Sequence, residues 1–306
     1  MEINIFNKQI TTKNYYCLLN EETTLQKIDK PFIYLFIQTT NQCQANCPFC
    51  IYHNNEIIDF DLDKLSVILR EISNSDEYVV RKLNFTGGEP LLNMSLFDKL
   101  CNCVVKNFNF KKDVYTEVTL NTNGINLMDV LDYNHLFDFI ALSRHHHLDT
   151  NNQHIFKTDK LPSAETIIRF TEELDRKFIM MLRCNLITNQ IDSWETIKEY
   201  MDFFLDGEIH RFSFVTLMKN NVFCNTHQVD FNTLIKNRPE LRKIQQLTRI
   251  ENNEYYCRCS NYIYQNDKGQ LGTFYSRDFC NNYIKDSTLV YDGKYLRYGF
   301  GGEIIY

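Results

Sequence analysis

The chain has 306 residues, of which 43% are hydrophobic and 24% are charged. This composition excludes a disordered protein, and the length favours one large domain with a modest appendage over two equal domains. The longest unbroken apolar run spans only Phe32 to Ile37, which excludes a transmembrane helix of about 20 residues. The net charge of −6 is spread without long runs, so we expect neither a nucleic-acid partner nor a membrane partner.

Short apolar segments alternate with amphipathic ones along most of the chain. Apolar residues at helical spacing predict a helix from Leu62 to Ile72. Ser163 is expected to cap a helix after the fourth strand, and Asp192 with Glu195 to cap the helix after the fifth. The predicted strands are Phe32–Gln38, Lys82–Thr86, Glu117–Asn121, Phe137–Ser143, Phe178–Asn185 and Arg211–Leu217.

This alternation predicts a parallel sheet covered by helices, arranged either as an open doubly wound sheet or as a segment of a barrel. After about residue 249 the pattern changes to short antiparallel strands, with turn signals at Asn266–Gly269 and Asp292–Gly293. We therefore divide the chain into a lead-in (1–31), a core (32–220) and a C-terminal helix with a β-rich cap (221–306). In either architecture the C-terminal ends of the parallel strands carry the site.

Three cysteines follow the first predicted strand closely: Cys43, Cys47 and Cys50. The chain has 11 cysteines and no visible export signal, so we expect thiols that are buried, bind metal or act in redox chemistry. A structural zinc site would need a fourth ligand, which His53 offers in the sequence. An iron–sulfur cluster is the alternative, because three thiolates on a four-iron cluster leave one iron open for a substrate or cofactor.

A pair of glycines closes the second predicted strand, in the segment Gly87-Gly88-Glu89-Pro90. Adjacent glycines let the backbone approach a ligand closely, although an ordinary strand-to-helix turn has the same composition. The later strand ends are polar as well, and the third of them continues into Asn121-Thr122-Asn123-Gly124.

In this order, the three-cysteine loop and the Gly-Gly-Glu-Pro segment resemble the radical S-adenosylmethionine (SAM) superfamily. The order of the motifs over residues 32 to 220 resembles the branch that contains the molybdenum-cofactor cyclisation enzyme and peptide-modifying members. The resemblance implies a partial (β/α)6 TIM-like barrel with a small β-rich C-terminal extension. It also implies a [4Fe–4S] cluster on Cys43, Cys47 and Cys50, whose open iron chelates SAM. The reduced cluster then cleaves SAM to methionine and a 5′-deoxyadenosyl radical, which abstracts hydrogen from the substrate.

The resemblance further implies which residues contact SAM. The Gly-Gly-Glu segment would hold the amino group, and the Glu89 carboxylate would accept a hydrogen bond from the ammonium. The expected cofactor-binding residues are Phe49 against the adenine, Gly87, Gly88 and Glu89 at the amino group, Asn121 and Thr122 in the third strand's turn, Ser143 at the methionine carboxylate, Arg183 and Asn185 at the carboxylate and ribose, and Met218 at the adenine.

A basic stretch, Arg144-His145-His146-His147, follows Ser143 directly. If Ser143 touches SAM, the next residues border the place where the radical meets its target. Imidazole groups donate, accept or transfer protons near neutral pH. We therefore expect Arg144, His145 and His146 to contact the substrate as catalytic residues, with a solvated basic loop as the alternative.

The remaining cysteines leave three alternatives open. Cys224, Cys257, Cys259 and Cys280 would hold a second iron–sulfur cluster, as family members with a C-terminal cluster extension do, or they are ordinary buried thiols. In the third alternative, one of them returns a hydrogen atom to a substrate radical, as in radical epimerases. Cys17, Cys101, Cys103 and Cys184 are interpreted as structural.

The resemblance predicts an oxygen-sensitive cytoplasmic enzyme that takes electrons from a reductant such as flavodoxin or ferredoxin. Only about 31 residues precede the first strand, so we expect a small-metabolite substrate first and a peptide second. A glycyl-radical activase is an alternative within the enzyme class. A zinc-stabilised binding module is an alternative from another class.

Overall fold

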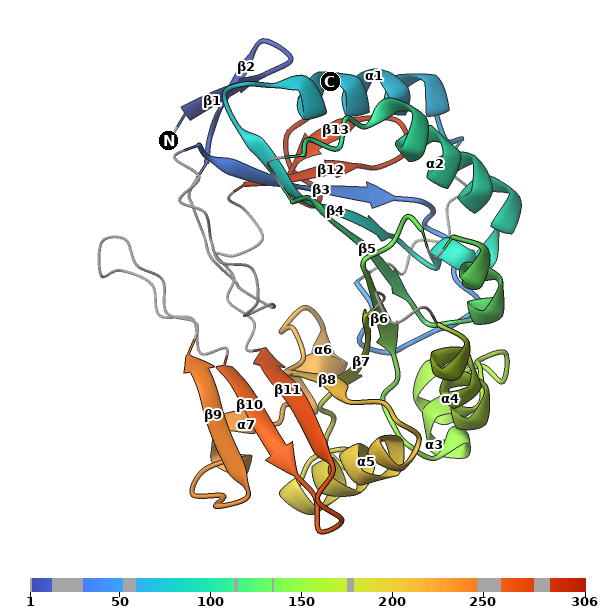
Figure 1. Cartoon of the computed structure of the whole chain (residues 1–306), viewed down its shortest axis with the longest axis vertical. Coiled ribbons are helices and arrows are strands. Elements are labelled where there is room, and N and C mark those ends of the chain that lie inside the picture. The colour runs from blue at the N-terminus through green and yellow to red at the C-terminus, as the bar shows by residue number, and fades with distance from the viewer. Residues whose placement is uncertain are drawn as a thin grey trace.

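Strands whose buried faces are apolar build a curved sheet at the centre of the computed structural model (Figure 1). The structure describes residues 2–12, 30–51, 59–112, 115–133, 135–174, 179–246, 260–277 and 287–306. The strands of the sheet, in chain order, are β3 (Phe32–Gln38), β4 (Val79–Thr86), β5 (Glu117–Thr122), β6 (Phe139–Ser143), β7 (Ile179–Asn185), β8 (Arg211–Val215), β9 (Leu241–Gln246), β10 (Ser260–Gln265), β11 (Leu271–Arg277), β12 (Thr288–Tyr291) and β13 (Leu296–Tyr298).

The strands β3 to β8 lie side by side in chain order, and every neighbouring pair among them is parallel. They correspond to the six strands predicted from sequence, although β4 begins earlier, at Val79, β6 begins later, at Phe139, and β8 ends earlier, at Val215. Phe178, the expected first residue of β7, lies outside the described residues. One face of each strand is apolar and fully buried, as Ile33, Leu35 and Ile37 show in β3. Figure 1 shows the helices that connect β3 to β8 along the outer side of this arc, so the buried face packs against them.

The helices that cover the sheet begin at polar caps. Ser163 caps its helix as predicted, because its Oγ accepts a hydrogen bond from the Thr166 backbone N–H at 3.1 Å. The predicted Asp192 and Glu195 capping pair is wrong: Ser193 is the cap and exchanges hydrogen bonds with Thr196. Asp192 instead accepts from the Asn189 backbone N–H. The helices are α1 (Leu62–Asn74), α2 (Met94–Asn107), α3 (Asp149–Phe156), α4 (Ala164–Glu173), α5 (Trp194–Asp206), α6 (Val222–Thr226), α7 (Phe231–Leu234) and the 3₁₀ helices η1 (Pro90–Leu92) and η2 (Leu127–Tyr133).

The C-terminal strands extend both edges of the parallel sheet. The turn signals at 266–269 and 292–293 connect the antiparallel pairs β10–β11 and β12–β13, as predicted. β11 then pairs in parallel with β8, and β12 pairs in parallel with β3. Within the described residues the outermost strands β9 and β13 do not pair, so the barrel is partial and carries a β-rich C-terminal extension.

A second, two-stranded sheet precedes the barrel and was not expected from sequence. It is the hairpin β1 (Glu2–Ile5) and β2 (Lys8–Thr11). Its Ile3, Ile5 and Ile10 side chains are buried in the main hydrophobic core. In the described ranges no helix is both long and apolar enough to cross a membrane.

Candidate active site

The cysteine loop follows β3 and is fastened by the glycine pair that follows β4. The Gly88 N–H donates to the Thr40 carbonyl at 2.6 Å, and the Glu89 N–H donates to the Gln42 carbonyl at 2.9 Å. A Cβ atom on Gly87 or Gly88 would overlap these same carbonyl oxygens, and Gly87 has φ of +136°. The absence of side chains therefore lets this segment approach the cysteine loop, whereas the sequence alone suggested an approach to a ligand.

Two other elements hold the far end of the cysteine loop. The Asn46 N–H donates to the carbonyl of Phe156, the last residue of α3. Asn221, the cap of α6, donates its side-chain N–H to the Pro48 carbonyl at 3.0 Å. Phe49 packs against the small buried cluster that includes Cys224. The loop itself follows β3. It is thus bound to segments that follow β4, β6 and β8, all at the C-terminal edge of the parallel sheet.

The three thiols of this loop lie close enough to influence one another's charge. Burial is the main cause that raises the pKa of Cys43 to about 11, and burial also raises the pKa of Cys47; in both cases the neighbouring thiols add to the effect. Thiolate sulfur is the donor that binds iron–sulfur clusters. Among the described residues no three Cys, His, Asp or Glu side chains are placed to hold a single metal ion, and His53, the fourth zinc ligand considered above, lies outside the described residues.

Glu89 is almost fully buried, and its carboxylate accepts hydrogen bonds from other groups of the protein. Its Oε1 accepts from the Thr122 hydroxyl at 2.5 Å and from the Leu91 N–H at 2.9 Å, while its Oε2 accepts from the Asn123 N–H at 2.7 Å. Burial raises the pKa of this carboxyl to about 7. In the structure the Glu89 carboxylate therefore joins the glycine segment to the turn after β5. The resemblance implied that this carboxylate contacts the SAM ammonium.

Asn123 was not singled out from sequence, although it lies in the Asn121-Thr122-Asn123-Gly124 turn. It is buried, and its Nδ2 donates to the Cys43 sulfur at 3.5 Å. Its Oδ1 accepts from Gln44 Nε2 at 2.8 Å. The sequence signal that could have pointed to Asn123 is its place in a turn. Asn side chains in turns often accept a hydrogen bond from the backbone two residues later, which holds them rigidly.

The other predicted cofactor residues lie toward the C-terminal ends of β5, β6 and β7 or, for Met218, after β8. Asn121 accepts from Arg183 Nη1 at 3.0 Å and donates to Asn84, which links β4, β5 and β7. Ser143 is paired with Arg183 in the register of β6 and β7. The backbone N–H of Asn185 donates to His145 Nδ1. Met218 follows β8, and its carbonyl accepts from the Asn220 N–H at 2.8 Å.

Arg144 is buried and binds the loop that follows it. Its Nε donates to the His146 carbonyl at 2.7 Å, and its Nη2 donates to the His147 carbonyl at 2.9 Å. Nη2 also pairs with Asp149 at 2.6 Å, and Nη1 donates to the Pro162 carbonyl. Only 2% of Arg144 is exposed. This placement makes Arg144 a structural support of the loop and differs from the expected contact with substrate.

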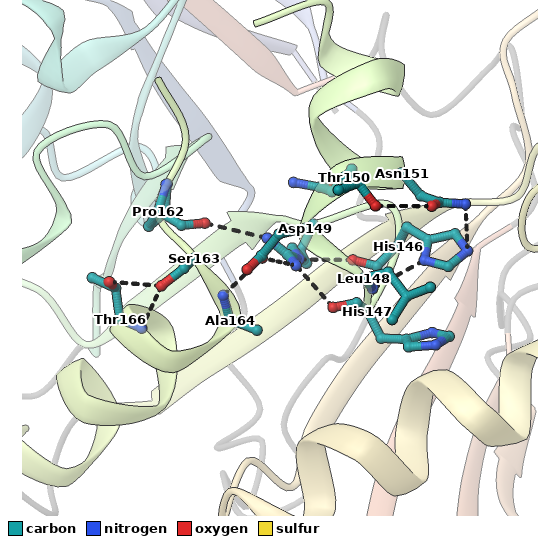
Figure 2. Close-up of polar contacts among 12 residues, drawn as sticks. His146, His147, Leu148, Asp149, Thr150, Asn151, Pro162, Ser163, Ala164 and Thr166 are labelled. Atoms are coloured by element: carbon teal, nitrogen blue, oxygen red, sulfur yellow. Dashed lines mark hydrogen bonds and ion pairs between the residues drawn. The ribbon is translucent and has the colours of Figure 1, made fainter. Parts of the chain in front are cut away.

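His146 is also engaged within this loop. Its Nδ1 accepts from the Leu148 N–H at 3.0 Å, and its Nε2 lies 3.4 Å from Asn151 Nδ2 (Figure 2). Burial, with the positive charge of Arg144 nearby, lowers the pKa of His146 to about 4. The ring is therefore neutral at physiological pH and shapes the turn that leads into α3.

His145 lies between the cysteine loop and α3. Its ring stacks on Phe156 at 4.7 Å between centroids and meets the edge of Phe49 at 5.1 Å. Its Nδ1 accepts from the Asn185 N–H at 3.0 Å, so in the neutral ring the proton sits on Nε2. Burial is the main cause that lowers the pKa of His145 to about 3, and the charges of Arg144 and Arg183 add to it.

The lowered pKa of His145 predicts a pH-dependent loss of stability. Below pH 6.5 the unfolded chain takes up a proton on His145 that the folded chain does not, so stability falls as the pH drops from 6.5 toward 3. His145→Phe keeps the stacking but removes the titration. The variant is expected to have a lower free energy of unfolding than the unmodified chain at pH 7. In urea unfolding, this difference is expected to become smaller by about 2 kcal/mol when the pH is lowered from 7 to 5.

The matched change at exposed His210, His210→Phe, controls for the general effect of replacing an imidazole by a phenyl ring. A deficit for His145→Phe that stays constant across this pH range would contradict the neutral, buried ring.

Comparisons with known proteins show which family the chain belongs to. The model of the Radical SAM superfamily matches residues 37–204, more than half of the chain. The GTP 3′,8-cyclase of Clostridium perfringens is 33% identical over 105 residues, which cover 34% of this chain and 31% of the relative. An uncharacterised protein of Methanocaldococcus jannaschii is 34% identical over 90 residues, which cover 28% of this chain and 31% of the relative. These matches span about a third of the length of the curated relatives.

Among solved structures, Streptococcus suis SuiB bound to S-adenosylmethionine aligns with a TM-score of 0.49 and 19% identity, covering 65% of this chain and 44% of SuiB. The family match spans the strands and loops that hold all three cysteines, the glycine pair and the turn with Asn123. The chain belongs to the radical SAM superfamily, a family of enzymes that use a [4Fe–4S] cluster and S-adenosylmethionine.

Proposed function

We propose that Cys43, Cys47 and Cys50 hold the [4Fe–4S] cluster and that SAM binds beside it at the C-terminal edge of the sheet. The observation that carries this proposal is the docking of the three-thiol loop against both the glycine segment and the turn with Asn123. With both groups bound, the site would supply a 5′-deoxyadenosyl radical that removes a hydrogen atom from a substrate.

The residues that line the sheet beside this loop suit the polar groups of SAM. Ser143 and Arg183 are register partners at the ends of β6 and β7, where a hydroxyl and a guanidinium can bind a carboxylate together. Phe49 offers an aromatic face next to the cysteines. Met218 and Asn185 lie at the neighbouring strand ends and complete the proposed cofactor site with Gly87 and Gly88.

We propose a small polar metabolite as the substrate, with a peptide as the second candidate. The relatives from Clostridium perfringens are named for a reaction of GTP, which is a small molecule. The face of the sheet away from the helices carries Asn84, Asn121 and Arg183, which hydrogen bonds link across β4, β5 and β7. Polar groups of this kind favour a polar ligand. A flavodoxin or ferredoxin in the cytoplasm is the proposed electron donor.

Anaerobic turnover tests both halves of the proposal. Reconstituted protein is expected to contain about four irons and four sulfides per chain, and to form 5′-deoxyadenosine from SAM when dithionite is present. In a pool of deuterated metabolites, deuterium is expected to appear in 5′-deoxyadenosine. A deuterated peptide pool is the parallel arm. Zinc in place of iron, with no SAM cleavage, would overturn the cluster assignment, and label from the peptide arm alone would overturn the choice of substrate.

A further inference from the structure

We propose that the side-chain amide of Asn123 donates a hydrogen bond to the cluster-bound sulfur of Cys43 and thereby raises the reduction potential of the cluster. Asn123 would thus act as a positioning residue for electron transfer, outside the set that contacts SAM or substrate. The inference rests on the proposed role of Cys43 as a cluster ligand.

The direction of the Asn123 amide is fixed by a partner that can only donate. The backbone N–H of Ile125 donates to Asn123 Oδ1 at 3.2 Å. The oxygen must therefore face Ile125, which leaves Nδ2 facing the Cys43 sulfur at 3.5 Å, a normal length for a hydrogen bond to sulfur. Gln44 contacts both ends of this amide, since its Nε2 donates to Oδ1 at 2.8 Å and its Oε1 accepts from Nδ2 at 3.3 Å. Rotating the amide by half a turn would place two donors against each other at Ile125.

The backbone of Asn123 is held as firmly as its side chain. Its N–H donates to Glu89 Oε2 at 2.7 Å, and the preceding Thr122 hydroxyl donates to Glu89 Oε1. The Gly124 N–H in turn donates to the Thr122 hydroxyl oxygen at 2.8 Å. Glu89 also donates its own N–H to the Gln42 carbonyl in the cysteine loop. One buried residue therefore sets the position of Asn123 relative to Cys43.

Hydrogen bonds to cluster sulfurs are among the factors that set reduction potential, because they stabilise the more negative, reduced cluster. Cys43 has two N–H groups directed at its sulfur, the backbone N–H of Ala45 at 3.4 Å and the side chain of Asn123. The backbone donor cannot be removed by substitution. Asn123 is the donor that a single change can remove.

The test is a redox titration of the reconstituted holoenzyme, followed by the electron paramagnetic resonance signal of the reduced cluster. Asn123→Ala removes the donor. Asn123→Asp keeps the oxygen that accepts from Ile125 but presents a second oxygen to the sulfur in place of the N–H. We expect the equilibrium constant for one-electron reduction to fall about tenfold in Asn123→Ala, which is about 59 mV, and to fall at least as far in Asn123→Asp.

Asn126→Ala is the matched control, because Asn126 lies in the same turn and donates its side-chain N–H to the Leu91 carbonyl at 2.8 Å, away from Cys43. Its potential is expected to equal that of the unmodified protein. An unchanged potential in Asn123→Ala with four irons bound would overturn the inference. If that variant binds less iron, Asn123→Asp decides in its place, because it keeps the turn.

The same preparations separate this inference from the proposed function. Full iron content in Cys43→Ala would remove Cys43 from the ligand set and so overturn the proposed cluster assignment. Loss of iron from Cys43→Ala, combined with an unchanged potential in both Asn123 variants, would overturn the role of Asn123 alone.

Discussion

A chain in which Cys43, Cys47 and Cys50 are all replaced by alanine is expected to form no 5′-deoxyadenosine from SAM in the presence of reductant. Without the thiolates there is no ligand set for the cluster, and iron content is expected to fall to background. The loop should keep its path, because backbone groups rather than sulfur atoms fasten it to the glycine segment and to α3. Iron analysis, circular dichroism and chromatographic detection of 5′-deoxyadenosine measure the three expectations.

Cys101 and Cys103 provide the matched control for this variant. Both lie on α2, where Cys101 is buried in the main core and Cys103 packs against it. The double change to alanine is expected to keep the full iron content and SAM cleavage. Formation of 5′-deoxyadenosine by the triple variant would contradict the ligand assignment. Close to four irons retained in that variant would instead point to a second cluster, for which Cys257, Cys259 and Cys280 lie outside the described residues.

The parallel core was predictable from sequence because each of its strands carries the same local signal. A buried parallel strand reads as a nearly continuous apolar run, as β3 does, and β3, β5 and β8 begin at the residues predicted from sequence, Phe32, Glu117 and Arg211. The grouping of the motifs at one edge of the sheet was predictable as well, because the C-terminal ends of parallel strands meet at one edge whatever the lengths of the loops between them. The cysteine loop, the glycine pair and the turn with Asn123 do meet there.

Local reasoning failed where a segment depends on partners far along the chain. The hairpin of β1 and β2 turns at Phe6 and Asn7, both with positive φ, so it lacks the glycine that normally marks such a turn. Its hydrophobic residues are buried by the body of the protein. At α5 the failure was local: the sequence predicted Asp192 with Glu195 as the capping pair, whereas Ser193 is the cap because it exchanges hydrogen bonds with Thr196 three residues later.

The side chains of the candidate site were the hardest to assign, because a polar residue near a site serves either the ligand or the scaffold. Glu89 bonds to Thr122 and Asn123, more than 30 residues away in sequence. Asn123 in turn bonds to Cys43, 80 residues away. No spacing rule reports such partners. A buried polar group must find hydrogen bonds somewhere, and here the scaffold supplies them.

Replacing Arg144 by alanine is expected to lower the free energy of unfolding by about 3–5 kcal/mol, because three carbonyl oxygens would lose a charged donor and each such hydrogen bond contributes about 1.5–3 kcal/mol. The ion pair itself adds little, because the Asp149 side chain is 41% exposed. The guanidinium binds three carbonyl oxygens and Asp149 at once. Asp149 Oδ1 also accepts from the Ala164 N–H, so the lost charge would loosen both the loop after β6 and the start of α4. Denaturant unfolding of both proteins at equal iron content measures the difference.

Two further variants show whether this loss arises from the geometry of the guanidinium. Arg144→Lys keeps the charge, but its compact ammonium cannot reach all four acceptors, so about 1.5–3 kcal/mol should still be lost. Arg169→Ala removes an exposed arginine from α4 and should change stability by no more than about 0.5 kcal/mol. If Arg144→Ala unfolds like the unmodified chain yet forms more 5′-deoxyadenosine than product, the guanidinium binds substrate after all. A large loss of stability, with Arg144→Lys in between, identifies Arg144 as the residue that holds the loop after β6 in place beside the cysteines.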